Sequence, residues 1–188
     1  MIEGHQINLR TMLEKDMGEV FTALSNLREK GEHWPVTLPS DPLHRKMFAE
    51  TGFWNETYSR MLITDKVDTI LGEICFFKNA PHHAGLEIGY HIYRQADRGR
   101  GITTEALRLF SAYLFDLLPI PRLQITCLKE NTGSRRVAEK CGFTYEGCLR
   151  QATFSRGEHH DLELFSLLRQ ECPPLKDMLQ SSSSSVKQ

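Results

Sequence analysis

Apolar residues recur along this chain with two different periods, and each change of period marks the start of a new expected element. A spacing of three or four predicts an amphipathic helix, whereas strict alternation predicts a half-buried strand. Helical spacing is found in four segments, which are residues 14–30, 42–56, 102–117 and 132–140. Strand-like patterning is found in seven segments, which are residues 7–11, 61–63, 69–77, 86–93, 123–127, 144–153 and 159–167. The chain therefore mixes helices with strands.

Turn and capping residues bound these segments. Gly31 closes the first helix, and Asp41 is expected as the N-cap of the second, with Pro42 at its first position. Pro119 follows the third helix, and Asn131 is placed to cap the fourth. The order of elements predicts an α/β (mixed α+β) protein, with a mixed sheet that carries helices on both faces.

The length and the composition of the chain indicate one domain. The 188 residues are enough for a single hydrophobic core, and no repeat or second domain is visible. We expect the domain to cover residues 1–170. A flexible tail is expected over residues 171–188, because Ser181 to Ser185 form an uninterrupted serine run.

The charge and the cysteines exclude several classes of protein. The net charge is −1 and no basic stripe is interleaved with aromatic residues, so neither nucleic acid nor a membrane surface is an expected partner. No apolar run approaches the roughly 20 residues of a membrane helix, and the first residues lack the pattern of a signal peptide. The five scattered cysteines indicate reduced thiols and a cytoplasmic location. A monomer and a homodimer are both compatible with the sequence.

The most specific local signal is a glycine-rich turn between a strand and a helix. The strand Leu86–Tyr93 is followed by Arg98-Gly99-Arg100-Gly101-Ile102, where the third helix begins. Such a turn can direct several backbone amides at one anion, and the N-terminus of the helix adds its positive dipole. Glycine also lets the backbone approach a phosphate without a Cβ in the way. The turn therefore predicts a site for a phosphorylated ligand.

Three segments in this order resemble the GNAT superfamily of acyl-CoA-dependent N-acetyltransferases, and in particular its RimJ/RimL-like branch. They are Leu86–Tyr90, Arg98–Ala106 and Asn131–Phe143, the last followed by Glu146-Gly147. The resemblance covers about residues 5–169. It implies a twisted, mostly antiparallel sheet of about seven strands with one splayed parallel pair. It also implies an enzyme that transfers an acetyl group from acetyl-CoA to a primary amine by direct attack in a ternary complex, with no metal.

The resemblance also implies which residues bind acetyl-CoA. The pyrophosphate is assigned to the turn, through the amides of Arg98, Gly99, Arg100, Gly101 and Ile102, with Thr103 next to them. Ala96 stands where many family members have Gln or Arg, but backbone donors do not depend on that side chain. The pantetheine arm is expected to pair with the strand end at His91, Ile92 and Tyr93 as an added strand. Asn131 and Ser134 are also assigned to cofactor binding. Asn131 either contacts the arm or is a plain helix cap. Arg135, Arg136 and Lys140 either reach the nucleotide or form a solvated basic face.

Two side chains are the first candidates for catalysis. Glu87 lies on the strand before the turn, on the face opposite its apolar stripe, and is the preferred base; the alternative is an exposed or ion-paired carboxylate. His91 shares that face and is the second candidate. Many family members protonate the thiolate with a tyrosine where this chain has Ala138, so Ser134 is assigned that role instead. Ser134 could equally be a capping hydroxyl, and Tyr90 is expected to be a sheet residue.

The acceptor is expected to bind at the least regular part of the chain. Trp34, Trp54 and Glu87 are assigned to acceptor binding, although the two tryptophans could instead anchor the first two helices to the sheet. The N-terminal α-amine of a protein or peptide is the preferred acceptor. A small amine such as an antibiotic, a polyamine or an aminoacyl compound is the alternative, and a non-catalytic acyl-CoA-binding sensor is a third possibility. His159, His160 and Asp161 have the composition of metal ligands, but neighbours in a strand point to opposite faces, so no metal is expected.

Overall fold

The fold is described from a computed structural model, which describes residues 1–78 and 84–183. Within this part of the chain, eight strands form one sheet in the order β1-β2-β3-β4-β5-β6-β8-β7. Neighbouring strands are antiparallel except for β5 and β6, which are parallel. The strands are β1 (Ile2–Glu3), β2 (Asn8–Thr11), β3 (Tyr58–Thr64), β4 (Ile70–Phe77), β5 (Leu86–Ile92), β6 (Arg122–Leu128), β7 (Thr144–Ser155) and β8 (Glu158–Leu168). The expected mixed sheet is confirmed, with one short strand, β1, more than the sequence pattern predicted.

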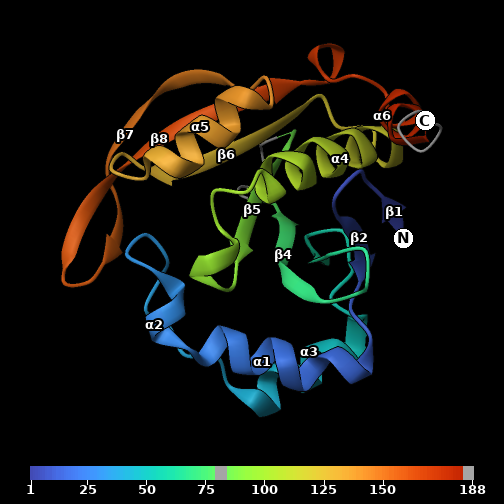
Figure 1. Ribbon diagram of the computed structural model, residues 1–188. Helices are drawn as coiled ribbons and strands as arrows, with labels where there is room; N and C mark the ends of the chain where they lie inside the picture. Colours follow the sequence, from blue (N-terminus) through green and yellow to red (C-terminus); the bar gives the residue numbers. More distant parts are fainter. Residues whose placement is uncertain (79–83, 184–188) are drawn as a thin grey trace.

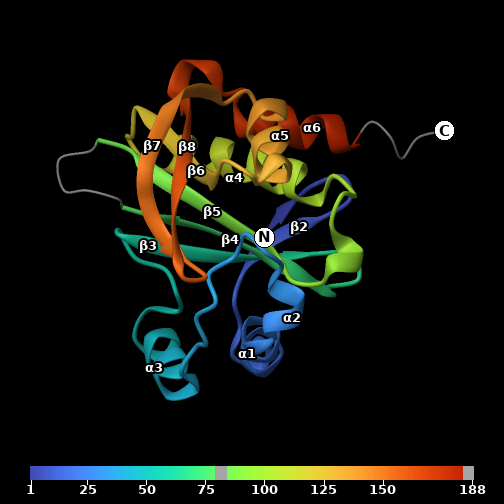
Figure 2. The same ribbon diagram turned by 90° about the vertical axis from the view of Figure 1, so that its left-hand side faces the viewer.

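Helices cover both faces of this sheet (Figures 1 and 2). One face carries α1 (Met17–Ser25), α2 (Leu27–Lys30) and α3 (Asp41–Thr51). The other carries α4 (Ile102–Leu117), α5 (Thr132–Lys140) and α6 (Leu175–Ser183). Short 3-10 turns lie at Glu14–Asp16, Gln95–Asp97 and Arg169–Glu171.

Each face of the sheet has its own hydrophobic core. The larger core joins the sheet to α4 and α5 and includes Ile74, Ile88, Phe110 and Phe165. The smaller core lies under α1 and α3; its members are Met12, Met17, Val20, Leu24, Phe53, Leu62, Ile70 and Tyr93. The side chains of β5 alternate between the two faces. Leu86, Ile88 and Ile92 belong to the larger core, so Glu87, Gly89 and His91 face the side of α1 to α3.

The parallel pair separates soon after it forms. β5 and β6 are paired at Leu86 with Leu123 and at Glu87 with Gln124. Beyond these two positions β5 continues to Ile92 and β6 to Leu128, and no further pairing of the two strands is found among the described residues. The strands therefore splay at the centre of the sheet, as the resemblance implied. The turn before α4 and the start of α5 follow the diverging ends of β5 and β6.

Three boundaries differ from the sequence prediction, each for a local reason. The first predicted helix is broken at Asn26, whose side chain accepts a hydrogen bond from the Arg28 amide (3.2 Å) and so caps a new helix, α2. The N-cap of α3 is Ser40, while Asp41 is its first residue. The helix ends at Gly52, which has a left-handed φ of 59°, earlier than expected.

The tail also differs from its prediction. Leu175–Ser183 form α6 instead of a flexible segment, and Leu175, Met178 and Leu179 pack against the larger core. Apolar residues at spacings of three and one provide this contact, which the serine run obscured. The last part of the expected tail, residues 184–188, lies outside the described residues.

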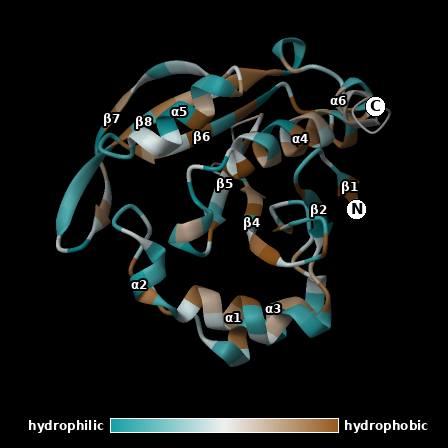
Figure 3. Cartoon of the chain, viewed as in Figure 1, coloured by the Kyte–Doolittle hydropathy of each residue, from teal (hydrophilic) through white to brown (hydrophobic). Residues whose placement is uncertain are grey.

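Hydropathy follows the layered arrangement (Figure 3). The outer end of the β7–β8 hairpin is largely hydrophilic, whereas the central strands carry hydrophobic residues. None of the helices within residues 1–78 and 84–183 combines the length and the apolar character needed to cross a bilayer.

Candidate active site

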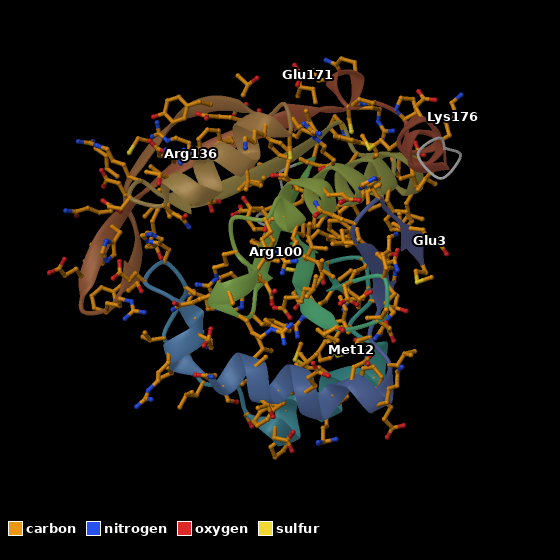
Figure 4. All side chains as sticks on the ribbon, in the orientation of Figure 1. Glu3, Met12, Arg100, Arg136, Glu171 and Lys176 are labelled. Atoms are coloured by element: carbon orange, nitrogen blue, oxygen red, sulfur yellow. The ribbon has the colours of Figure 1, made fainter. Side chains whose placement is uncertain are left out.

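A cavity of about 430 Å³ opens where β5 and β6 diverge. Its walls come from four segments that are remote in sequence: residues 30–34, the end of β5, the turn before α4, and the first turns of α5. Figure 4 shows side chains on these segments, with Arg100 from the turn and Arg136 from α5 labelled. The cavity thus joins the predicted phosphate turn to the predicted acceptor loop.

The glycine turn presents backbone amides to this cavity. Gly99 and Gly101 have left-handed φ angles of 75° and 82°, which glycine adopts without strain. Among the described residues, the amides of Gly99, Arg100 and Gly101 have no acceptor within the protein. The first amides of α4, at Ile102 and Thr103, have no acceptor within the helix, as at any helix start. The turn therefore offers a set of free donors together with the positive end of α4.

The shape of the turn is fixed by Asp97. Its buried carboxylate accepts hydrogen bonds from the side chains of Arg94 and Arg100, both at 2.8 Å. The Arg98 amide donates to the Gln95 carbonyl (3.1 Å), so the expectation that this amide contacts the pyrophosphate is corrected. The Arg98 guanidinium also donates to the Ile92 carbonyl at 3.0 and 3.2 Å, and it ties β5 to the turn. Arg98 is thus a structural residue of the turn.

The end of β5 offers fewer backbone groups than expected. The Tyr93 amide donates to the Leu71 carbonyl of β4 (3.0 Å), and its hydroxyl donates to Glu73 (2.8 Å). Because successive amides of a strand alternate in direction, the His91 amide also faces β4, whereas those of Tyr90 and Ile92 face the gap beside β6. The expected pairing of a ligand with His91 and Tyr93 is therefore corrected to Tyr90 and Ile92.

Two hydroxyl groups meet on the α5 side of the cavity. The Tyr90 and Ser134 hydroxyl oxygens are 2.8 Å apart, and either can donate. Asn131 caps α5 by accepting from the Ser134 amide (3.0 Å), which fixes the position of Ser134. Burial raises the pKa of Tyr90 above its ordinary value, which keeps its hydroxyl protonated. No sequence pattern indicated that Tyr90 lies next to Ser134, because the alternation along the strand predicted a plain sheet residue.

The structure separates the two candidates for the base. Glu87 is buried, and its carboxylate accepts hydrogen bonds from Gln124 (2.9 Å) and Thr126 (2.6 Å) of β6. It bridges the two strands at the last paired position and does not line the cavity. His91 does line the cavity, and it lies under the indole of Trp34, with ring centroids 4.3 Å apart and planes inclined by 12°.

The two predicted tryptophans lie on opposite faces of the sheet. Trp34 is part of the cavity wall. Trp54 packs against Phe76 and Tyr113, at ring-centroid distances of 6.2 and 6.1 Å, on the α4 side. Trp54 is not part of the cavity lining, so the structure brings only Trp34 to this site. Trp54 packs the sheet against α4 and does not anchor the first two helices. The difference arises because Trp54 forms an isolated β-bridge with Ser59 of β3, whereas Trp34 lies in a loop that reaches β5.

The basic residues of α5 also divide into two groups. Arg136 and Lys140 line the cavity, which makes them candidates for contact with the nucleotide. Arg135 forms an ion pair with the buried Glu163 of β8 and serves the packing of α5 instead. The His159-His160-Asp161 segment lies in β8, where His160 contacts the Ser155 carbonyl (3.0 Å). Among the described residues, no group of three or more His, Cys, Asp or Glu side chains is placed to hold a metal ion.

The glycine turn at a helix N-terminus, the splayed parallel pair and the cavity between them together define an acyl-CoA-binding fold. The chain belongs to the GNAT acetyltransferase family, whose domain model matches residues 6–144. It is an acetyl-CoA-dependent N-acetyltransferase.

Similar proteins in other organisms are also named as acetyltransferases. The ribosomal-protein-serine acetyltransferase of Escherichia coli (strain K12) is 30% identical over 135 residues, which cover 71% of this chain and 75% of the relative. The N-acetyltransferase YoaA of Bacillus subtilis (strain 168) is 31% identical over 172 residues, covering 90% of this chain and 97% of the relative.

Solved structures share the fold. A spermidine N-acetyltransferase from Vibrio cholerae, in complex with CoA and spermine, superposes with a TM-score of 0.77 at 20% identity and covers 88% of this chain and 97% of its own. RimL, a ribosomal L7/L12 alpha-N-protein acetyltransferase in complex with coenzyme A, has a TM-score of 0.73 at 22% identity and covers 89% and 97%. At these identities the two structures support the fold and do not distinguish one acceptor from another.

Proposed function

We propose that this enzyme acetylates the N-terminal α-amine of a protein or peptide. The observation that carries the proposal is the charge of the cavity. The cations Arg98, Arg136 and Lys140 line the side of the glycine turn and α5, whereas the side of residues 30–34 and His91 carries the cation Lys30. Of the two acids in the described lining, Asp97 is already paired with Arg94 and Arg100, which leaves Glu32.

This balance of charge bears on the acceptor. A polyamine carries several positive charges, and its binding requires several carboxylates to offset them. A peptide N-terminus brings one amine, and the rest of the peptide can lie outside the cavity. The serine acetyltransferase of E. coli, which is 30% identical to this chain, is named for a ribosomal protein and thus supports the same choice.

On the donor side, we assign the diphosphate of acetyl-CoA to the amides of Gly99, Arg100, Gly101, Ile102 and Thr103. The amides of Tyr90 and Ile92 face the gap between the strands, where they can pair with the pantetheine arm as an added strand would. The Ile92 amide is also a candidate donor to the oxyanion that forms when the amine attacks the thioester carbonyl.

We assign to Ser134 the protonation of the sulfur. When the tetrahedral intermediate collapses, the C–S bond breaks and the electron pair stays on sulfur, which takes the hydroxyl proton of Ser134. Tyr90, at 2.8 Å, can replace that proton, since its own hydroxyl remains protonated. Asn131 acts indirectly in this scheme, because it fixes the first turn of α5 and hence Ser134.

A panel of acceptors tests the proposal. The purified enzyme is given acetyl-CoA and either a peptide with a free N-terminal serine, the same peptide with its N-terminus blocked, or spermine, and the release of the CoA thiol is measured. Both peptides contain lysine, so that each offers side-chain amines. We expect turnover with the free peptide and none with the blocked one, whose lysine side chains are unchanged. Faster turnover of spermine at equal concentration would overturn the proposed acceptor, and thermal stabilisation by acetyl-CoA without any turnover would indicate a sensor.

A further inference from the structure

His91 is a buried histidine whose ring nitrogens have no partner. Its side chain is 5% exposed, and among the described residues neither Nδ1 nor Nε2 makes a hydrogen bond. Burying a polar group without a partner is unfavourable, so such groups are rare in folded proteins and call for an explanation. The ring lines the cavity at the end of β5, one residue from the Ile92 amide. His91 is therefore placed to meet a ligand group that enters this cavity.

The position of the ring is fixed from several sides. Trp34 stacks on one face of it at 4.3 Å, and the ring of Tyr93 meets it edge to face at 5.5 Å. Trp34 is in turn placed by a loop that is held at two points: Lys30 donates to the Thr37 carbonyl, and Arg156 donates to the carbonyls of Gly31 (2.8 Å) and Glu32 (3.0 Å). An imidazole held in this way is preorganised for a defined contact.

The charged groups around the ring keep it neutral. Burial, together with the cations Arg98 and Lys30, lowers the pKa of His91 to about 4. Glu73 lies opposite His91 on β4, but its carboxylate is occupied by Arg60 (3.4 Å) and by the Tyr93 hydroxyl (2.8 Å). The imidazole therefore carries a free lone pair at neutral pH, which is what the removal of a proton requires.

We propose that His91 contacts the attacking amine and takes its proton during acetyl transfer, and that Trp34 holds the imidazole in place and forms one wall of the acceptor site. The neutral amine attacks the thioester carbonyl carbon, a C–N bond forms, and the proton leaves the nitrogen for the imidazole. The C–S bond then breaks, and the sulfur receives a proton from the Ser134 side. Exchange with water restores His91 and Ser134. This proposal rests on acetyl transfer to an amine and not on the identity of the acceptor.

A weak base of this kind limits which amines react. As the C–N bond forms, the nitrogen becomes positive and much more acidic than the free ammonium, so even a weakly basic imidazole can accept its proton. The imidazole cannot, however, deprotonate the ammonium form of the free amine. An α-amine has a pKa of about 7.7–8.0 and is partly neutral at physiological pH, whereas a lysine-type amine, with a pKa of about 10.4, is almost entirely charged. His91 thus favours an α-amine by its chemistry.

The test compares His91→Asn with the wild type between pH 6 and 10, using whichever amine of the acceptor panel is acetylated. We expect kcat to fall by about 10²–10⁴-fold, the range typical of a lost general base, while the KM for acetyl-CoA is unchanged. The wild-type rate should level off above the pKa of the amine, whereas the variant rate should continue to rise as hydroxide replaces the imidazole. In His91→Gly, imidazole added to the buffer should restore part of the activity.

His44→Asn is the matched control. His44 is also buried, its Nε2 also lacks a partner, and its pKa is also lowered to about 4, but it lies in α3 and does not line the cavity. Its replacement should lower stability and leave the shape of the pH profile as in the wild type.

Three outcomes would overturn the role of His91: a His91→Asn variant with near wild-type kcat, one whose profile levels off as the wild type does, or no rescue of His91→Gly although acetyl-CoA still stabilises it. If no amine of the panel reacts with the wild type, the proposed acceptor fails. His91 is then tested by the NMR signals of its ring in the presence of CoA and the free-serine peptide, where unchanged signals would also overturn its role.

Discussion

The two ends of the cavity are built by different means. The donor end consists of the glycine turn and the first turn of α5, and its main contacts are backbone amides that a short stretch of chain presents together. The acceptor end consists of residues 30–34 and His91, and it depends on side chains from two segments that are remote in sequence. The donor end therefore suits a constant ligand such as acetyl-CoA, while the acceptor end can change with single substitutions in a loop.

The largest effect is expected at the donor end, from Gly101→Val. Gly101 has a φ of 82°, and a β-branched side chain would disturb the turn and turn its amides away from the diphosphate. Since hydrogen bonds to charged groups contribute about 1.5–3 kcal/mol each, we expect acetyl-CoA to bind about 100-fold more weakly. Calorimetric titration with CoA measures this.

Gly52→Val separates binding from strain in that experiment. Gly52 also has a left-handed φ, 59°, but it ends α3, away from the cavity. Both variants should lose about 1–2 kcal/mol of stability, the usual penalty for a side chain in this conformation. Equal CoA affinity in the Gly101 variant and the Gly52 variant would contradict the assignment of the turn to the diphosphate.

A smaller effect is expected at the acceptor end, from Trp34→Ala. Losing the stacking on His91 should raise the KM for the acceptor about 10-fold, since aromatic pairs contribute about 0.5–1.5 kcal/mol, and leave the affinity for CoA unchanged. Trp54→Ala, on the opposite face, should instead destabilise the fold by about 3 kcal/mol with little change in the KM. Steady-state kinetics and urea unfolding of both variants provide the comparison, and an unchanged acceptor KM in Trp34→Ala would remove Trp34 from the site.

The last effect concerns the stability of the fold in acid. His44 and His91 both lie on the α1-to-α3 side of the sheet, with pKa values of about 4 against an ordinary 6.5. Between these values the unfolded chain binds protons that the folded chain does not, so stability is complete above about pH 6.5 and is lost as the pH falls toward 4. We expect a loss of about 2 kcal/mol, and a weaker pH dependence in His44→Asn.

Hydrogen exchange shows where this loss falls. At pH 4.5 the amides of α1 and α3 should exchange faster, relative to those of α4 and α5, than they do at pH 7. Uniform acceleration in all of these helices would contradict the difference between the two faces.

The donor end could be predicted from the sequence because its signals are local. The glycines, the helix start at Ile102 and the Asn131 cap lie within a few residues of the groups that they position, and the structure has each of them where the pattern indicated. The local pattern did not reveal that carbonyl groups of the protein compete with a ligand for some of these backbone amides. The amides of Arg98 and Tyr93 are used by Gln95 and Leu71, and these bonds depend on how the chain folds back.

The acceptor end could be predicted only as a region. Trp34 and Trp54 received the same assignment from the sequence, and their separation onto two faces follows from the bridge of Trp54 to Ser59 and from the path of the loop 31–40. Glu87 and His91 share a face of β5 by alternation. The structure shows in addition that the Glu87 carboxylate accepts hydrogen bonds from Gln124 and Thr126. It also shows that His91 lines the cavity. The helical tail was missed because composition outweighed a short apolar pattern.

The brief pairing of β5 with β6 has a mechanical consequence. Strands β1 to β5 and strands β6 to β8 form two parts of the sheet, joined by the short pairing of β5 with β6. The hydrogen bonds from Gln124 and Thr126 to Glu87 lie at one end of this pairing. A pantetheine arm bound along Tyr90 and Ile92 would extend the contact between β5 and β6. The concentration of acetyl-CoA would then set how rigidly the two parts of the sheet are joined, so that the acceptor binds to a more rigid site once acetyl-CoA is bound.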